Sequence, residues 1–166
     1  RPPISTLDRA SAASDFYNRQ GLEIVFKIQK TGFEIFLALK FHDIPNTVSR
    51  SVSAAAELGV WMTNVHAFGG VRMMTSAKQV LIEQGSDMLL IAVTVLTSMD
   101  SAELAETGVS TMLENQVLHL ARQVKESGLD GVVCSAQEAR LLRTEMGKNF
   151  SLVTPGIRLL GDRNHD

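Results

Sequence analysis

Lys40 and Asp43 are the residues best suited to acid–base chemistry in this sequence. Lys40 closes the apolar run Phe36–Leu39, so we expect its stem to be packed and its ammonium to lie at a strand end. An ammonium in that position needs a counter-charge to stay protonated, and Asp43 is the nearest candidate in sequence. Such a pair can deliver a proton to a developing carbanion. For an isolated K-x-x-D pattern, however, a structural ion pair in a loop is the commoner interpretation.

Other polar residues allow further chemistry. The segment Thr154–Arg158 combines a glycine, which exposes backbone N–H groups, with an arginine that can bind phosphate, so it indicates an anion site. A turn with a solvated arginine would give the same sequence pattern. His42 and His66 have no carboxylate at metal-ligand spacing, so we interpret both as hydrogen-bonded structural histidines and predict no metal site. Cys134 lies in an apolar run without a basic neighbour, which predicts an inert buried thiol.

Five apolar runs predict the strands that would position these residues. Each run follows a glycine of the kind that ends helices, and each is almost continuously apolar, as in strands buried on both faces. The predicted strands are Phe33–Leu39, Val60–Val65, Met88–Val95, Gly131–Cys134 and Phe150–Thr154. Strands that alternate with helices imply a parallel sheet, either doubly wound or part of a β/α barrel. In both, polar residues at the carboxyl ends of the strands gather at one edge.

Apolar residues at helical spacing predict the helices between the strands. Thr47 can cap the first of these helices, and Pro45 argues against any earlier start. The predicted buried faces are Val48, Val52, Ala55 and Ala56; Val71, Met74 and Leu81; and Leu113, Val117, Leu120, Ala121 and Val124.

The composition limits the class of protein. The 166 residues are 45% hydrophobic and 20% charged, which fits one globular domain over residues 1–166. A net charge of −2 argues against a nucleic-acid binder with a broad basic face, and the apolar runs are too short to span a membrane. The single cysteine excludes an internal disulfide and a cysteine-based zinc cluster. No signal peptide is visible, so we expect a cytoplasmic protein.

The number of strands is too small for a complete barrel, which has eight strands and about 250 residues. Ile4–Leu7 is a possible sixth strand, but it is short and follows two prolines. A barrel with missing strands leaves sheet edges unpaired. We therefore expect these residues to be part of a longer polypeptide.

The run Phe36–Thr47, F-L-A-L-K-F-H-D-I-P-N-T, resembles the signature F-L-D-L-K-F-H-D-I-P-N-T of the orotidine 5′-phosphate decarboxylases, most closely the bacterial ones. The likeness covers roughly residues 21–158, and Phe68 stands where the family usually has serine before Gly-Gly. It continues through Leu58–Met62, Asn64–Ala67, Arg72–Met74, Val93–Ser98, Gly128–Glu138 and Leu152–Arg158.

The resemblance implies a (β/α)8 TIM barrel, here partial, that works as a homodimer. It also implies conversion of orotidine 5′-monophosphate to UMP and CO₂ in pyrimidine biosynthesis, without metal or organic cofactor. By matching position, Lys40 would protonate C6 of the pyrimidine, and Asp43 would reach the partner's site across the dimer interface. The implied substrate contacts are Asp8 to the ribose, Thr47 to the partner's ligand, Thr97 to the pyrimidine and Arg158 to the phosphate.

Departures from the family pattern leave alternatives open. Ala38 replaces the first aspartate of D-x-K-x-x-D, so we expect slow decarboxylation. The family's second-strand lysine and its last strand have no counterpart in the sequence. One alternative is a metal-dependent phosphate-sugar decarboxylase of the same superfamily, in which we would not expect His42–Thr47 or Thr154–Arg158. The other is a non-catalytic barrel remnant, which Ala38 favours.

Overall fold

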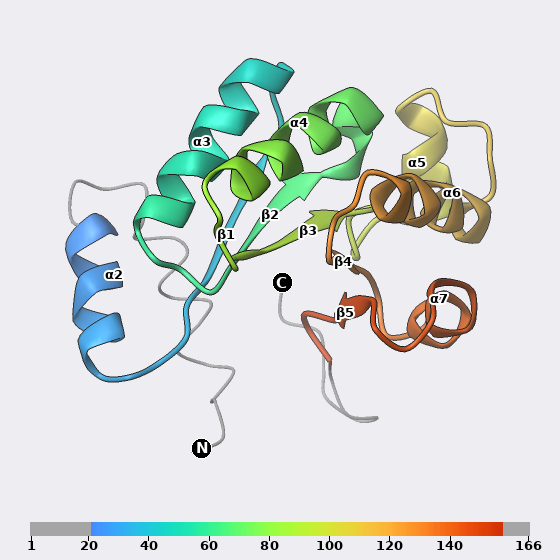
Figure 1. Cartoon of the computed structure of the whole chain (residues 1–166). Helices are drawn as coiled ribbons and strands as arrows, with labels where there is room; N and C mark the ends of the chain where they lie inside the picture. The colour runs from blue at the N-terminus through green and yellow to red at the C-terminus, as the bar shows by residue number, and fades with distance from the viewer. Residues whose placement is uncertain (1–20, 158–166) are drawn as a thin grey trace.

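The computed structural model describes residues 21–157, in which helices and parallel strands alternate (Figure 1). The strands are β1 (Phe36–Phe41), β2 (Met62–His66), β3 (Leu89–Val93), β4 (Gly131–Val133) and β5 (Ser151–Val153). The helices are α2 (Gly21–Lys30), α3 (Pro45–Glu57), α4 (Gly70–Glu83), α5 (Ser101–Glu106), α6 (Leu113–Glu126) and α7 (Ala139–Met146), with a short 3-10 turn, η1 (Ala67–Gly69). The possible strand Ile4–Leu7 and the site residues Asp8 and Arg158 lie outside the described residues.

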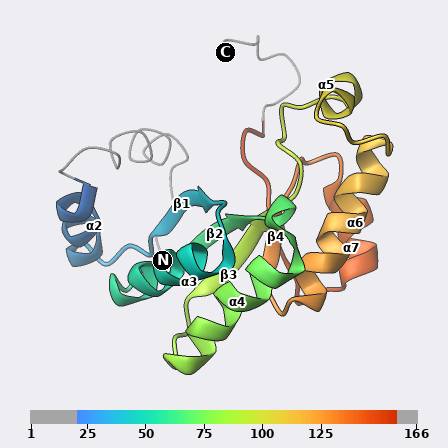
Figure 2. The same ribbon diagram turned by 90° about the horizontal axis from the view of Figure 1, so that it is seen from above.

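The sheet has the topology of a barrel rather than of a doubly wound fold. Its five strands are all parallel and lie in the order β1-β2-β3-β4-β5, so each new strand is added on the same side of the previous one. A doubly wound sheet reverses direction at a switch point, and none occurs here. Figure 2 shows α3, α4, α6 and α7 following one side of this sheet in sequence order. Within the described residues, the predicted five-strand parallel sheet is confirmed.

The strands bury side chains on both faces, which explains their continuous apolar character. Leu90 and Ala92 of β3 belong to the large cluster shared with the helices. Ile91 and Val93, the alternate residues of the same strand, belong to a separate cluster on the opposite face together with Met62 of β2. Because successive side chains of a strand point to opposite faces, the smaller cluster marks the interior of the curved sheet.

The helix boundaries correct two predictions. The first turn of α3 begins at Pro45, with Ile44 as the residue before it, so Thr47 does not cap the helix. Proline fits the first helical position because its missing N–H would have had no helical partner there. Val71 was predicted to be buried but is 43% exposed, since it lies in the first turn of α4 and off its buried stripe. That stripe consists of Met73, Met74, Ala77 and Leu81.

Other helix faces agree with the prediction. Val48, Val52 and Ala55 are buried on α3, and Val117, Leu120, Ala121 and Val124 are buried on α6. Ala56 and Leu113, also predicted for these faces, are partly buried. No helix in the range 21–157 has the length and apolar character needed to cross a bilayer.

A polar network ties α4 to the amino ends of three strands. Lys78 Nζ lies 3.0 and 2.8 Å from the two carboxylate oxygens of Asp130. Asp130 Oδ2 also accepts the backbone N–H of Leu90 at 2.8 Å, and the Asp130 carbonyl accepts that of Ser151 at 2.9 Å. This edge is opposite to the one where active sites of such sheets lie, so we assign Asp130 to stability.

Candidate functional site at the carboxyl end of the sheet

Lys40 lies in a bulge at the end of β1. Leu37 pairs with Thr63 and Phe41 pairs with Val65, so β1 advances four residues while β2 advances two. Lys40 has φ +52°, the single non-glycine residue with positive φ among those described. Its backbone N–H donates to Oδ1 of Asn64 at 2.7 Å. Bulges of this kind re-aim a side chain beside a functional site, and a left-handed lysine persists only when its surroundings enforce it.

The surroundings of Lys40 differ from the predicted packed stem and aspartate partner. Lys40 is exposed and lies within the irregular stretch of β1. No ion pair joins it to Asp43 in the described structure, although both residues lie at the same edge. Asp43 is exposed and its Oδ1 instead accepts the N–H of Ile44 at 2.6 Å. The Asp43 carboxylate is therefore held by the backbone just before α3 rather than by the Lys40 ammonium.

His66, at the end of β2, forms an aromatic group with His42 and Phe68. The His42 and His66 rings stack with centroids 5.3 Å apart, and Phe68 lies 6.2 Å from His66. Burial lowers the pKa of His66, and the nearby His42 and Lys40 lower it further. Nδ1 of His66 is buried without a hydrogen-bond partner among the described residues, so the prediction of a hydrogen-bonded histidine is wrong for this atom.

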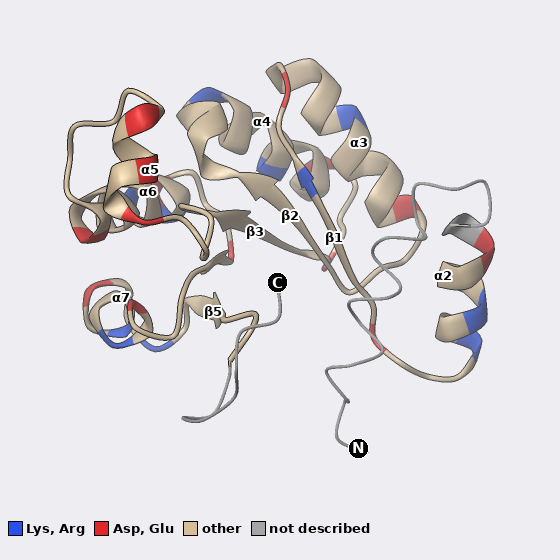
Figure 3. Ribbon diagram, turned by 180° about the vertical axis from the view of Figure 1, so that it is seen from behind, with Lys and Arg blue, Asp and Glu red and all other residues tan. Residues whose placement is uncertain are grey.

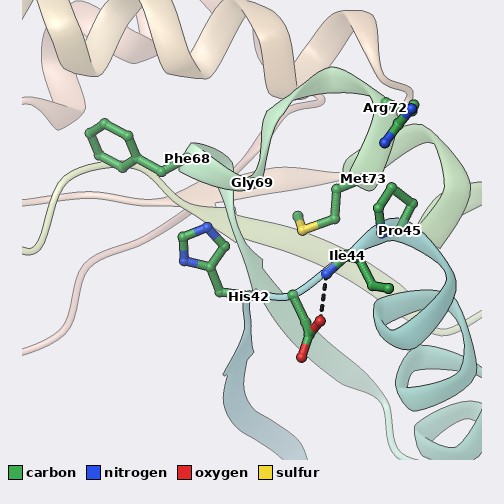
Figure 4. Close-up of a pocket in the computed structure, with 8 residues that line it drawn as sticks. His42, Ile44, Pro45, Phe68, Gly69, Arg72 and Met73 are labelled. Carbon is green, nitrogen blue, oxygen red and sulfur yellow. Dashed lines mark hydrogen bonds between the residues drawn. The ribbon is translucent and has the colours of Figure 1, made fainter.

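An open hollow lies beside this group, between the β1–α3 connection and the start of α4 (Figure 4). It is lined by His42, Asp43, Ile44, Pro45, Phe68, Gly69, Arg72 and Met73. Ile44 is 66% exposed and Phe68 is 40% exposed, so part of the rim is apolar. Gly69 allows the close approach of Met73, since an added Cβ would overlap the Met73 thioether.

The two threonines expected to contact substrate lie at the same edge of the sheet. Thr47 is exposed in the first turn of α3, and Thr97 is exposed in the connection that follows β3. The neighbouring Thr94 has another role: it is fully buried, and its hydroxyl donates to the Val133 carbonyl at 3.1 Å, which ties β3 to β4.

Cys134, which follows β4, is fully buried, as predicted. Burial raises the pKa of its thiol to about 11, with a further increase from Glu138 and a smaller opposing effect from Arg143. A thiol in this state is a poor nucleophile near neutral pH. No three His, Cys, Asp or Glu side chains within residues 21–157 are grouped so as to hold a metal ion.

Two residues of this region, Asn64 and Arg72, fall within the family-like runs but are not among the predicted site residues. Asn64 is 1% exposed, and its contact with Lys40 depends on a bulge that no sequence pattern announces. A possible signal was an amide inside the buried run of β2, because such a group must find a hydrogen-bond partner. Arg72 lines the hollow from α4; the resemblance includes Arg72–Met74 but assigns Arg72 no role.

Comparisons with known proteins agree with the geometry. Residues 12–166 match the family model described as "Orotidine 5'-phosphate decarboxylase / HUMPS family". The orotidine 5′-phosphate decarboxylase of Vibrio vulnificus strain YJ016 is 54% identical over 159 residues, which are 95% of this chain and 68% of that protein. The corresponding enzyme of Photobacterium profundum is 53% identical over 95% of this chain and 69% of its own length. The chain thus spans about two thirds of these relatives.

Solved structures show the same fold. The crystal structure of orotidine 5′-phosphate decarboxylase from Lactobacillus acidophilus superposes with a TM-score of 0.77 at 45% identity, covering 83% of this chain and 64% of that one. An uncharacterized conserved protein from Geobacillus kaustophilus gives a TM-score of 0.79 at 44% identity, covering 84% and 67%. The five parallel strands are therefore part of a TIM barrel, and the chain belongs to the orotidine 5′-phosphate decarboxylase family.

Proposed function

We propose that this chain decarboxylates orotidine 5′-monophosphate to UMP and CO₂ without a metal or organic cofactor. The observation that carries the proposal is the position of Lys40. The lysine of the family-like run Phe36–Thr47 lies in a left-handed bulge at the carboxyl end of β1, with its side chain exposed. The carboxyl ends of the strands are where barrels place their chemistry.

The proposed step uses the Lys40 ammonium. The bond between C6 and the carboxylate breaks, its electron pair stays on C6, and CO₂ leaves. A fixed ammonium stabilises the charge that develops on C6. Lys40 then gives a proton to C6, which becomes C6–H, and the lysine is left as a neutral amine. The lysine regains its proton from solvent.

Ala38 is expected to slow this step. It lies in β1, two residues before Lys40, where the family signature has aspartate. A carboxylate there would keep the lysine protonated and oriented. Without it, and without an ion pair from Asp43, the ammonium is less well fixed for its role. We therefore propose an enzyme of this specificity with reduced turnover.

We also propose a homodimer with shared sites, in which Asp43 and Thr47 reach the partner's substrate. Both residues are exposed at the start of α3. The exposed apolar side chains at the start of α3 and of α4, Ile44, Phe68 and Val71, are 40–66% exposed and suited to contact a second copy of the chain. Within each protomer, Thr97 would contact the pyrimidine, Asp8 the ribose and Arg158 the phosphate. A cytoplasmic location fits a nucleotide substrate of biosynthesis.

The direct test is to incubate the purified chain with orotidine 5′-monophosphate and quantify UMP by chromatography, with EDTA or with Mg²⁺. We expect slow UMP formation that EDTA does not change and that Lys40→Ala abolishes. Turnover that requires Mg²⁺ would instead support the metal-dependent phosphate-sugar decarboxylase. A parallel titration with UMP completes the test, because a chain that neither binds UMP nor forms it would be a non-catalytic remnant.

A further inference from the structure

The bulge at Lys40 depends on one side chain of the neighbouring strand. Asn64 is 1% exposed in the middle of β2, and its Oδ1 accepts the Lys40 backbone N–H at 2.7 Å. A buried amide is costly unless it is hydrogen-bonded, so this contact accounts for an amide at a buried position of β2. It also gives the N–H of a residue with positive φ a partner that the regular ladder does not supply.

A second contact fixes the other end of the same bulge. Thr63 is fully buried, and its hydroxyl donates to the Leu37 carbonyl at 2.9 Å. The two side chains are adjacent in β2. The Thr63 side chain contacts β1 at the start of the irregular stretch, and the Asn64 side chain contacts β1 within it. Thr63 fixes the point where regular pairing stops, whereas Asn64 contacts Lys40 itself.

We propose that Asn64 is a positioning residue for the decarboxylation: its amide oxygen holds Lys40 in the left-handed conformation that directs the ammonium toward the substrate. This inference rests on the proposed function for its catalytic consequence. A non-glycine residue with positive φ is strained, so it persists only while its surroundings enforce it. Loss of the Asn64 acceptor lets the backbone relax, and the ammonium moves with it.

The test compares Asn64→Ala with Thr94→Val. Thr94, which directly follows β3, is also fully buried, and its hydroxyl donates to a carbonyl of the neighbouring strand, but that bond joins β3 to β4, away from the bulge. Both variants should lose stability. In the Ala38→Asp background, Asn64→Ala should lower kcat by about 10–100-fold with KM within about threefold, since a misplacement of about 1 Å costs that much. Thr94→Val should leave kcat close to its parent.

Amide hydrogen exchange gives a readout that does not need activity. The Lys40 N–H should exchange slowly in the unmodified chain, exchange at least about tenfold faster in Asn64→Ala, and stay protected in Asn64→Asp, which retains an acceptor oxygen. If Asn64→Ala does not fold, the unmodified chain and Asn64→Asp still provide the comparison.

The outcomes separate the two proposals. Absence of UMP formation in the Ala38→Asp chain contradicts the proposed function. The exchange rate of the Lys40 N–H still tests whether Asn64 holds the Lys40 backbone. A fast-exchanging Lys40 amide in the unmodified chain overturns the positioning role. Equal kcat values for Asn64→Ala and Thr94→Val overturn it as well.

Discussion

At the scale of single residues, the site is a group of basic side chains with few acidic partners. Lys40 and His42 are close enough to His66 to lower its pKa, and Asp43 directs an oxygen to the Ile44 backbone. Ala38 removes the carboxylate that the family signature provides. The amino-acid sequence predicts Lys40 as the catalytic lysine, but it did not predict that the Lys40 backbone bonds to Asn64, 24 residues away.

His66 should make stability depend on pH. Its pKa is lowered in the folded chain, so below about pH 6.5, the ordinary histidine value, the unfolded chain binds the proton more readily. The stabilising contribution of a neutral His66 is therefore fully present above pH 6.5. It is lost as the pH falls toward the pKa of His66 in the folded chain. The denaturation midpoint of the chain should be lower at pH 5 than at pH 7, and His66→Asn should reduce the difference.

The control for this prediction is His119→Asn, a change at an exposed histidine of α6. The denaturation midpoints of all three proteins would be measured in urea at both pH values. An equal reduction of the pH difference in the two variants would contradict the specific role assigned to His66.

At the scale of helices and strands, the sequence predicted the existence of the five strands but not their boundaries. The first strand was predicted to begin at Phe33, but β1 begins at Phe36. The carbonyl of Ile35 accepts the N–H groups of Trp61 and Met62, and the regular ladder starts only after this residue. Apolar character alone does not distinguish such a connection from a strand. The bulge is a second such case, since register depends on the partner strand.

Helix α5 shows a similar limit. The segment between β3 and α6 has no strong apolar periodicity, yet Ser101–Glu106 is helical. Asp100 and Glu103 form a reciprocal capping box at its start, with the Asp100 carboxylate accepting the N–H of Ala102 and Glu103. In so short a helix, the capping contacts rather than a broad apolar face explain its formation.

The close contact of β4 with β5 predicts a large cost for Gly131→Ala. A Cβ at Gly131 would overlap the backbone carbonyl oxygen of Ser151, and a paired strand cannot give way easily. The free energy of unfolding should fall by about 3 kcal/mol, the upper end of the usual range for overpacked sites. Urea denaturation followed by circular dichroism measures it.

Gly32→Ala is the matched control for that prediction. Gly32 has φ +82° and no atom near the added Cβ, so its cost should be limited to about 1 kcal/mol of backbone strain. Equal losses at both positions would show that contact with Ser151 does not determine the effect.

At the scale of the whole molecule, the described residues form a parallel sheet covered by helices. The candidate site lies at the carboxyl ends of the strands, and the Lys78–Asp130 ion pair lies at their amino ends. Figure 3 shows Lys and Arg interspersed with Asp and Glu over the helices, consistent with a net charge of −2. The resemblance along the sequence predicted the barrel family correctly. The association of two copies is a property of surfaces, and the sequence indicates it only through the family.

The proposed shared sites predict complementation between inactive variants. In the Ala38→Asp background, Lys40→Ala and Asp43→Ala should each be inactive alone. A mixed dimer contains one site with both an intact Lys40 and an intact Asp43, so random exchange of subunits should restore about a quarter of the parental activity. The measurement is UMP formation after mixing under exchange conditions. Recovery of no activity from a mixture shown to contain mixed dimers would contradict the shared site.

The most direct test of the account is the rate of orotidine 5′-monophosphate decarboxylation by the chain and by its Ala38→Asp variant, measured side by side. A carboxylate two residues before Lys40 should fix the ammonium and raise kcat/KM by on the order of 100-fold or more. Adding Lys40→Ala to that variant should abolish the gain. Equal rates for the chain and Ala38→Asp, or a gain that survives the loss of Lys40, would contradict the role assigned to this lysine.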